Sequence, residues 1–307
     1  MQIHSTLATV SKPTAIALGN FDGVHCGHQQ VVCLVLKAAA GLVPTIVSFH
    51  PHPQEFFSGQ PRQFLTTVTE KAQVLGELGI EQLVLLDFNQ ALAKLTPPEF
   101  VERVLHQQLG ARHITIGADF HFGYQRQGDA PLLRTLAAEY GIKTNIVELA
   151  IDQNSRIGSS RIRSALLNCD LAEASRLLGR SYSLSGRVVA GQQLGRTLGF
   201  PTANIDYPPE KFLPHLGVYC VRVNTEQHQQ LPAVMNIGKR PTVNGQNTTV
   251  EVHLLNWSGD IYDQQITIYL DQFLRSEQKF AGLNELTAQI QADCEAAQSF
   301  YQEMGKT

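Results

Sequence analysis

The sequence predicts two domains of different fold class, an α/β domain at residues 1–180 and a mainly antiparallel β domain at residues 181–307. Two observations support this division. Up to residue 150, short apolar runs alternate with segments whose apolar residues recur at helical spacing, which is the pattern of βαβ units. After Gly186, the apolar segments are rich in β-branched and aromatic residues and are separated by turn residues, as in antiparallel sheets and barrels.

The elements of the first domain are expected in strict alternation. Apolar runs predict strands at residues 14–18, 45–49, 82–86, 113–116 and 144–148. Periodic segments predict helices at residues 28–40, 69–78 and 129–140, with a further helix that opens at residue 96. Strands joined in this way form a mainly parallel sheet with helices on both faces, and ligands bind at the carboxyl ends of its strands.

The second half of the chain begins after one more predicted helix. Leucines on one side of residues 162–178 predict a single helix that ends at Gly179, and the polar segment 181–185 marks the expected domain boundary. Strands are expected at residues 217–223, 248–255 and 265–270. Apolar residues spaced by three and four from Leu283 to Tyr301 predict a C-terminal helix that packs on the core.

Composition excludes several classes of protein. Hydrophobic residues make up 43% of the chain and charged residues 17%, so the chain can build real cores and is not disordered. A net charge of −3 argues against a nucleic-acid-binding protein, which usually presents a basic face. The start of the chain has no signal-peptide pattern, and no apolar run approaches a membrane helix, so we expect a cytoplasmic protein. The five scattered cysteines predict neither disulfides nor a CxxC metal site.

The first motif with chemical meaning joins a strand to the start of a helix. It reads Gly19-Asn-Phe-Asp-Gly-Val-His-Cys-Gly-His28. Glycines allow the backbone to approach a ligand closely, and free N–H groups at a helix start attract phosphate. His25 and His28 can donate hydrogen bonds to phosphate oxygens and stabilise the charge that grows on them during transfer at an α-phosphate.

Two other interpretations of this motif stay open at this point. It can be a tight turn with two surface histidines. It can also be part of a zinc site that activates water, although the spacing is not a standard zinc pattern. The residues that would supply such a site are Asp22, His25, Cys26, His28, His50 and His52.

Two further segments of the first domain carry polar or aromatic groups in suggestive places. Ser159 and Ser160 precede Arg161-Ile-Arg163 at a helix start, where positive charge is unfavourable unless an anion binds there. This pattern favours a triphosphate clamp over a helix cap with a solvated basic turn. The segment 117–128 follows a strand and contains two phenylalanines, a tyrosine and an arginine that could line a flat aromatic ligand, or could form a loop with core aromatics.

In the second domain, a glycine-rich stretch at residues 186–199 leads into Pro201-Thr-Ala-Asn204. Thr202 and Asn204 lie two residues apart, so on an extended segment their oxygens point to one side, where they could bind Mg²⁺. An ordinary turn is the alternative. Glu251 lies in an alternating strand; as a base it could accept a proton from an attacking hydroxyl, or it could simply face solvent.

These motifs, in this order, resemble those of the prokaryotic bifunctional riboflavin kinase/FAD synthetases. The H-x-G-H motif, the Ser-Ser-x-x-Arg segment, the G-x-D-F-x-F-G-x-x-R-x-G stretch and His50-Pro-His-Pro53 match the FMN adenylyltransferase module of that family. Residues from about Gly186 to Asp293 resemble its riboflavin kinase module. The resemblance implies a Rossmann-like nucleotidyltransferase domain followed by a six-stranded antiparallel barrel with a C-terminal helix.

The resemblance also implies roles for individual residues. The catalytic set is His25, His28 and Arg163 for adenylyl transfer and Glu251 as base for phosphorylation of riboflavin, with Thr202 and Asn204 serving Mg²⁺. The expected ATP-binding residues are Gly19, Phe21, Gly27, Ser159, Ser160, Arg161, Gly191, Gly195 and Arg196. The expected flavin-binding residues are Asp119, Phe120, Phe122, Arg126 and Arg275.

The expected activity is conversion of riboflavin to FMN and of FMN to FAD, with ATP and Mg²⁺ at both steps. The partners implied are riboflavin, FMN, FAD and ATP, without nucleic acid or membrane, in a monomer or weak homo-oligomer. The family has serine where this chain has Gly158, and Tyr-Gly where it has Tyr262-Asp263. Two rival hypotheses are a flavin-binding module with one inactive site and a zinc hydrolase built on the first motif.

Overall fold

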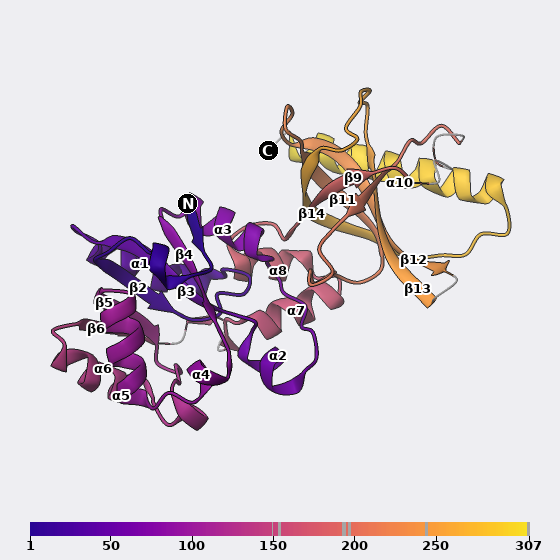
Figure 1. Cartoon of the computed structure of the whole chain (residues 1–307). Coiled ribbons are helices and arrows are strands. Elements are labelled where there is room, and N and C mark those ends of the chain that lie inside the picture. The colour runs from indigo at the N-terminus through magenta and orange to yellow at the C-terminus, as the bar shows by residue number, and fades with distance from the viewer. Residues whose placement is uncertain (149, 153–154, 192–194, 196–197, 243–244, 306–307) are drawn as a thin grey trace. The chain divides into compact units, whose positions relative to one another are not determined.

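The structure is a computed structural model that describes residues 1–148, 150–152, 155–191, 195, 198–242 and 245–305 (Figure 1). The chain divides into two compact units, Met1–Ser159 and Ser160–Thr307. The division lies about twenty residues before the predicted boundary at 180/181, because helices 159–167 and 171–178 pack with the second unit. None of the helices formed by the described residues has the length and apolarity needed to cross a membrane.

The first unit is built on a six-stranded sheet whose order is β1-β4-β3-β2-β5-β6. All neighbouring strands in it are parallel. Chain order runs outwards from β2 in one direction through β3 and β4, and in the other through β5 and β6, so the strand order reverses between β2 and β5. The strands are β1 (Gln2–His4), β2 (Thr14–Leu18), β3 (Val43–His50), β4 (Gln82–Asp87), β5 (Ala111–Gly117) and β6 (Lys143–Val147).

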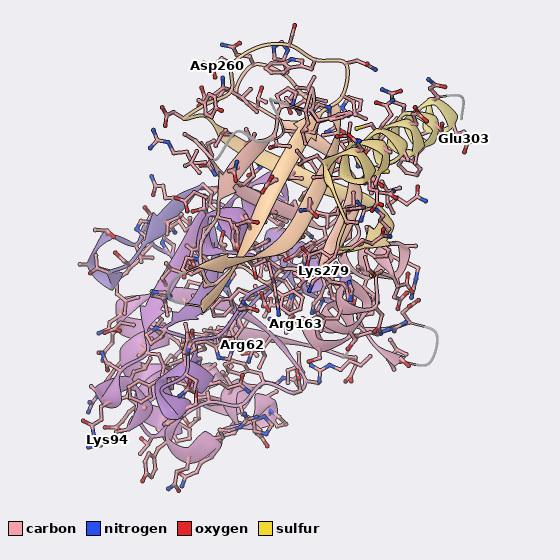
Figure 2. All side chains as sticks on the ribbon, turned by 90° about the vertical axis from the view of Figure 1, so that its right-hand side faces the viewer. Arg62, Lys94, Arg163, Asp260, Lys279 and Glu303 are labelled. Carbon is pink, nitrogen blue, oxygen red and sulfur yellow. The ribbon has the colours of Figure 1, made fainter. Side chains whose placement is uncertain are left out.

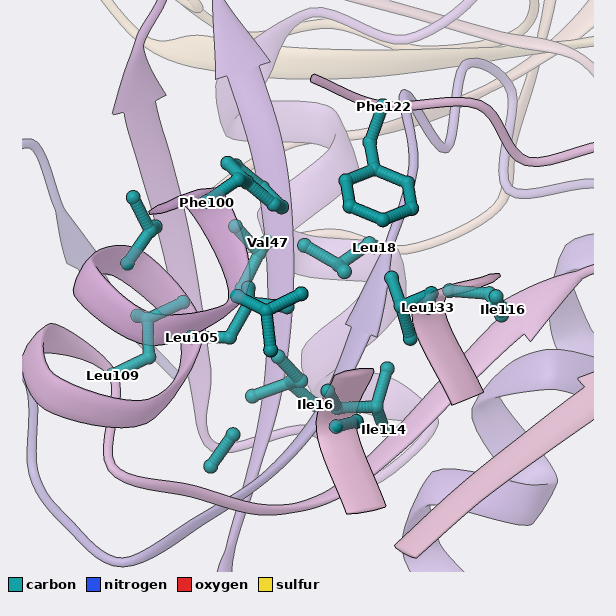
Figure 3. Close-up of a cluster of buried hydrophobic side chains, with 14 of the residues drawn as sticks. Ile16, Leu18, Val47, Phe100, Leu105, Leu109, Ile114, Ile116, Phe122 and Leu133 are labelled. Carbon is teal, nitrogen blue, oxygen red and sulfur yellow. The ribbon is translucent and has the colours of Figure 1, made fainter. Parts of the chain in front are cut away.

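Helices cover both faces of this sheet, as the sequence predicts. Side chains alternate along β2, so Ala15 and Ala17 pack on one face with α1 and α3, whereas Ile16 and Leu18 pack on the other. Figure 3 shows this second cluster, to which η2 supplies Phe100 and Leu105 and α6 supplies Leu133, with Leu109 directly after η2. The helices are η1 (Leu7–Thr9), α1 (Cys26–Ala38), α2 (Pro53–Ser58), α3 (Val68–Glu77), α4 (Gln90–Ala93), α5 (Pro97–Glu99), η2 (Phe100–Gln108), η3 (Tyr124–Arg126) and α6 (Ala130–Glu139).

The second unit contains a closed antiparallel barrel with strand order β10-β13-β12-β11-β14-β9, which confirms the barrel expected from the sequence. Helix α10 (Leu283–Met304) packs on it through Cys294 and Ala297, against Val218, Cys220 and Val234. The barrel strands are β9 (Ser183–Val189), β10 (Ala203–Asp206), β11 (Gly217–Asn224), β12 (Leu231–Thr242), β13 (Gly245–Leu254) and β14 (Gln265–Ser276).

One predicted helix is wrong. Residues 162–178 form two helices, α7 (Ser159–Leu167) and α8 (Leu171–Leu178), rather than one. Cys169 adopts a positive φ of 60°, and the side chain of Asp170 accepts the N–H of Glu173 to cap α8. The leucine stripe continues across this break, which is why spacing alone suggests a single helix.

Smaller differences concern the ends of elements. Helix α1 begins at Cys26, two residues earlier than expected, because His25 caps it. The polar segment 181–185 contributes to strand β9 instead of forming only a linker. Leu283, the first residue of the predicted apolar stripe of α10, is 57% exposed, so the packed part of the stripe starts later. A short hairpin of β7 (Ile151–Asp152) and β8 (Ser155–Arg156) precedes α7.

Candidate functional site

The loop after β2 leaves the sheet at the point where the strand order reverses. Phe21, Gly23 and Val24 all have positive φ values, of 48°, 84° and 43°. Such conformations are costly for phenylalanine and valine, so the surrounding contacts must hold them. The Asp22 carboxylate accepts the N–H groups of Leu65 at 2.8 Å and Thr66 at 3.4 Å. The loop is therefore fixed in place by the chain that leads into α3.

His25 and His28 are stacked at the start of α1, with ring centroids 3.6 Å apart. Nδ1 of His25 accepts the N–H of His28, which caps the helix. Nδ1 of His28 is enclosed and has no hydrogen-bond partner among the described residues. Burial, and then the nearby charges of His25, Lys71 and Arg156, hold the pKa of His28 well below its usual value. The structure thus brings both predicted histidines together at the switch point.

The other predicted residues of this motif play different local roles. Gly19 donates its N–H to the Val47 carbonyl at 3.1 Å and lies beside the Phe21 ring. Phe21 is buried in the core, and its ring packs against the His28 ring, with the two centroids 5.0 Å apart. Phe21 therefore helps to hold His28 in place. A side chain at Gly27 would crowd the ring of His25. Among the described residues, no group of three or more histidine, cysteine, aspartate or glutamate side chains is arranged to hold a metal ion.

The segment 117–128, here called the aromatic loop, follows β5, the direct neighbour of β2. It therefore lies at the same sheet edge as residues 19–28, the histidine loop. Phe122 is buried, pairs with Gly128 through two backbone hydrogen bonds and anchors the loop in the core. Phe120 is half-buried and stacks beside it, with centroids 5.9 Å apart. Asp119 is exposed and forms an ion pair with Arg156, and Arg126 is exposed. Phe122 is a core residue here, whereas Asp119, Phe120 and Arg126 remain accessible.

The serine and arginine segment lies at the start of α7. Ser159, the last residue of the first unit, donates its hydroxyl hydrogen to the Asp22 carbonyl of the same unit at 2.9 Å. Ser160 follows it, and its carbonyl accepts the Ser164 hydroxyl. Arg161 forms an ion pair with Glu173 of α8, so its charge already has a partner inside the protein. The argument that a charge at this helix start needs a bound anion therefore does not hold for Arg161.

Arg163 is placed by the second unit, to which it belongs. Its guanidinium carbon lies 5.5 Å from the centre of the Phe212 ring, a cation–π contact with the segment that precedes β11. In the same region, the His215 N–H donates to the Leu166 carbonyl of α7 at 3.2 Å. Figure 2 labels Arg163 among the side chains of the chain. The position of Arg163 is thus fixed by residues that no motif points to.

A second set of polar residues lines a cavity of about 300 Å³ between the barrel and α10. Strand register puts Glu251 directly opposite Asn204 on β10 and Asn236 on β12. Thr202 lies next to them, with its hydroxyl 3.5 Å from the Glu251 carboxylate. Val250 and Val252 point into the barrel core, so Glu251 points the other way, into the cavity rather than into open solvent.

Two of the predicted glycines, Gly191 and Gly195, lie so close to neighbouring groups that no side chain would fit there. A side chain at Gly191 would collide with the amide group of Asn204. One at Gly195 would collide with the Phe200 carbonyl and crowd the Thr202 hydroxyl. The absent side chains therefore let the backbone of Gly191 lie against Asn204 and that of Gly195 against Thr202. Arg196, the remaining predicted residue of this loop, lies outside the described residues.

Arg275 of β14 also lines the cavity. Its guanidinium donates three hydrogen bonds to Asp293 of α10, at 2.7, 2.9 and 3.2 Å, and Asp293 is 6% exposed. Gln289 also donates to Asp293. His253 lies 2.8 Å from the Pro201 carbonyl and holds the segment that carries Thr202. Sequence reasoning missed Asn236, His253 and Asp293, because only register and packing reveal them.

The comparisons with known proteins agree with this division of sites. The FAD synthetase family matches residues 7–161, and the riboflavin kinase family matches residues 178–301. A bifunctional riboflavin kinase/FMN adenylyltransferase of Pseudomonas fluorescens is 40% identical over 285 residues, covering 92% of this chain and 91% of that protein. The protein of the same description from Escherichia coli K12 is 37% identical, covering 97% of this chain and 96% of its own length.

A solved structure matches as well. The crystal structure of a Streptococcus pneumoniae protein described as a macrolide-efflux protein has a TM-score of 0.85 at 29% identity. The match covers 97% of this chain and 98% of that one, so both units and their order are shared. The relatives match nearly the whole length of this chain, and each of the two families matches the unit that contains the corresponding site. This chain belongs to the family of bifunctional riboflavin kinase/FMN adenylyltransferases.

Proposed function

We propose that the chain phosphorylates riboflavin to FMN in the barrel and adenylylates FMN to FAD in the N-terminal domain, releasing pyrophosphate. The observation that carries this proposal is the pair of separate sites, each lying in the part of the chain that matches the corresponding family. The match ends at residue 161 for one family and starts at 178 for the other. This gap supports a functional boundary near residue 180, although α7 and α8 pack with the second unit.

In the barrel, Glu251 is the proposed base. It would accept the proton of the riboflavin 5′-hydroxyl as that oxygen attacks the γ-phosphate of ATP. Its place in the lining of a cavity supports this role over that of a surface carboxylate. Gly191 and Gly195 would let the backbone approach the phosphates closely. Arg275, which lines the same cavity and is held by Asp293, would contact the flavin.

Mg²⁺ fits the polar groups on the barrel strands. The Thr202 hydroxyl, the Asn204 side chain and the Glu251 carboxylate lie together, and hard oxygen donors of this kind suit Mg²⁺. We propose that Thr202 and Asn204 hold the ion. When bound, it would neutralise negative charge on the ATP phosphates. Glycine at position 191 leaves room for the Asn204 amide group, because a Cβ there would collide with it.

In the N-terminal domain, the FMN phosphate is the proposed nucleophile at the α-phosphate of ATP. It is already an anion, so the step needs no general base. His25 and His28 would donate to the phosphate oxygens as charge grows on them, from positions that the stacked rings fix in advance. Arg163 and Ser160 would bind the same phosphates. Asp119, Phe120 and Arg126 would contact the flavin, with Phe122 as the anchor of their loop.

The proposed setting is the cytoplasm, where riboflavin and ATP are the small-molecule partners, and the proposed oligomeric state is a monomer or weak homo-oligomer. A chromatographic time course with riboflavin, ATP and Mg²⁺ tests the activity. We expect FMN to appear first and FAD to follow. A reaction that stops at FMN would contradict the adenylyltransferase assignment, and added FMN becoming FAD while riboflavin is untouched would contradict the kinase assignment. Flavin binding without any turnover would contradict both.

A further inference from the structure

Lys71 of α3 is a buried lysine beneath the histidine loop, and no sequence motif includes it. Its side chain is 7% exposed. Nζ donates to the Asn20 carbonyl at 2.7 Å and to the Ser48 hydroxyl at 3.3 Å. Ser48 in turn donates to the same Asn20 carbonyl at 3.2 Å. Lys71 therefore fastens the first residue of the loop after Gly19 to the carboxyl end of β3.

In the part of the chain that the structure describes, no carboxylate lies within 4.0 Å of the Lys71 Nζ, so its charge has no close counter-ion there. The nearest electrostatic support comes from Asp22, whose carboxylate is engaged by the backbone of Leu65 and Thr66. A buried and unpaired ammonium is costly to fold, and such groups concentrate at functional sites. An anion brought to this loop would relieve that cost.

We propose that Lys71 is a positioning residue for adenylyl transfer, whose ammonium fixes the loop through Asn20 and places positive charge beside His28 where the ATP phosphates bind. The proposal rests on the adenylyltransferase function proposed above for this domain. It is supported by the two hydrogen bonds from Lys71 to Asn20 and Ser48. The charge of Lys71 also helps to lower the pKa of His28, which is consistent with this placement. The location of Lys71 on the first unit, under the loop at the switch point, places its charge where an anion is expected.

The charge on Lys71 should depend on pH in an accessible range. Burial lowers the pKa of Lys71 to about 8, an effect that the charge of Asp22 partly opposes. The ammonium is present below that pH and is lost above it. The titratable groups that face it from other elements are Asp22 in the loop after β2, His28 on α1 and His52 at the start of α2; Glu70 precedes it on α3.

The neighbouring histidines titrate elsewhere. The pKa of His52 is lowered to about 4, mainly by burial, and that of His28 lies well below its usual value. Neither histidine can therefore produce a change in rate near pH 8. A falling limb of kcat/KM in that range would report the free enzyme's ammonium, because kcat/KM follows the ionisation of the unliganded protein.

The test compares Lys71→Met, Lys71→Arg and the matched control Lys94→Met, in which an exposed lysine is changed (Figure 2). FAD formation from FMN is measured from pH 6 to pH 10, with FMN formation from riboflavin as a second readout. We expect kcat/KM for ATP in the wild type to fall above about pH 8. Lys71→Met should lower kcat/KM for ATP at neutral pH roughly tenfold to a hundredfold, because a preorganised charge is lost. The variant should also no longer show the fall above about pH 8. Lys71→Arg should restore much of the rate and extend it to higher pH, since arginine stays charged.

The outcomes separate this proposal from the function on which it rests. If the wild type makes no FAD, the adenylyltransferase function itself fails. If the wild type makes FAD and Lys71→Met matches Lys94→Met, the proposal is overturned. A wild-type profile that stays flat through pH 8 to 9 also overturns it, even if Lys71→Met does not fold. A purely structural role would lower the yield of folded Lys71→Met. It would not explain a fall of kcat/KM for ATP above about pH 8 in the wild type.

Discussion

The two sites differ in how the chain fixes their polar groups. In the N-terminal domain, the groups lie on one tight loop and a helix start, where positive φ values at Phe21 and Val24 and buried hydrogen bonds hold the shape. In the barrel, they lie on different strands, and register places Asn204 and Asn236 on either side of Glu251. A loop site depends on local geometry, whereas a strand site depends on residues far apart in sequence. Single substitutions should therefore separate the two activities.

The largest expected effect belongs to Glu251→Gln. This change keeps the size of the side chain but removes the base, so FMN formation should fall by about 10²–10⁴-fold. FAD formation from added FMN should stay near the wild-type rate, because the loop site is untouched. Chromatography of both reactions checks this. Normal riboflavin turnover in the variant would rule out Glu251 as the base.

His28→Ala should produce the opposite selectivity. Loss of a fixed donor to the phosphates should cut FAD formation by about 10²-fold, while FMN formation continues. His228→Ala, which changes an exposed histidine of the second unit, serves as a control for general effects of histidine loss. An equal loss of both activities in His28→Ala would contradict the assignment.

The buried ion pair of the barrel should appear mainly in stability. Asp293→Asn leaves Arg275 without its charge partner, which should cost about 3 kcal/mol in the free energy of unfolding of the second unit. The double variant Arg275→Met with Asp293→Leu should cost less, since no lone charge stays buried. Denaturant unfolding followed by the single tryptophan, Trp257, measures both. Equal destabilisation by the two changes would argue against a role for the pair.

A smaller effect should depend on pH. Nδ1 of His52 accepts the Gln54 N–H to cap α2, and its pKa is lowered to about 4 when folded. The unfolded chain binds the proton more readily, so stability should be lost as pH falls from about 6.5 towards 4. We expect His52 to account for roughly 1 kcal/mol of that loss at pH 5, after allowing for solvent screening. His52→Asn keeps a cap and should melt with a shallower pH dependence than the wild type.

The smallest expected effect concerns Gly158. A Cβ at this position meets open space, so Gly158→Ser should fold normally. A serine hydroxyl beside Ser159 could give the ATP phosphates one more hydrogen bond, worth a roughly threefold lower KM for ATP in FAD formation. Gly158→Ala, which adds volume without a hydroxyl, is the matched control. If alanine and serine act alike, the hydroxyl does not bind ATP.

Sequence patterns predicted what is local in this molecule. The alternation of apolar runs and periodic segments gave the parallel sheet, and the position of the first motif after β2 placed both histidines at the sheet edge where they are found. The helix at 96 follows from the Thr96-Pro-Pro-Glu99 capping pattern, which the structure contains as a capping box. These features depend on neighbours within a few residues along the chain.

The features that sequence reasoning missed depend on long-range contacts. In the sequence, Lys71 is an ordinary lysine of a helix. Only the folded structure shows that its Nζ contacts the loop after β2. Arg161 looks like an anion-binding residue until α8 brings Glu173 beside it. The break between α7 and α8 is caused by the positive φ of Cys169. The spacing of the leucines does not reveal such a backbone conformation. Asn236 becomes part of the barrel site only through strand register.

The central claim is that two independent sites on one chain act in sequence, and a mixing experiment tests it most directly. Glu251→Gln and His28→Ala are each incubated with riboflavin, ATP and Mg²⁺, first alone and then together. We predict that neither variant alone makes FAD at an appreciable rate, and that the mixture makes FAD after a lag while FMN is released by one protein and taken up by the other. A mixture that makes no FAD, although both variants are folded, would contradict the account.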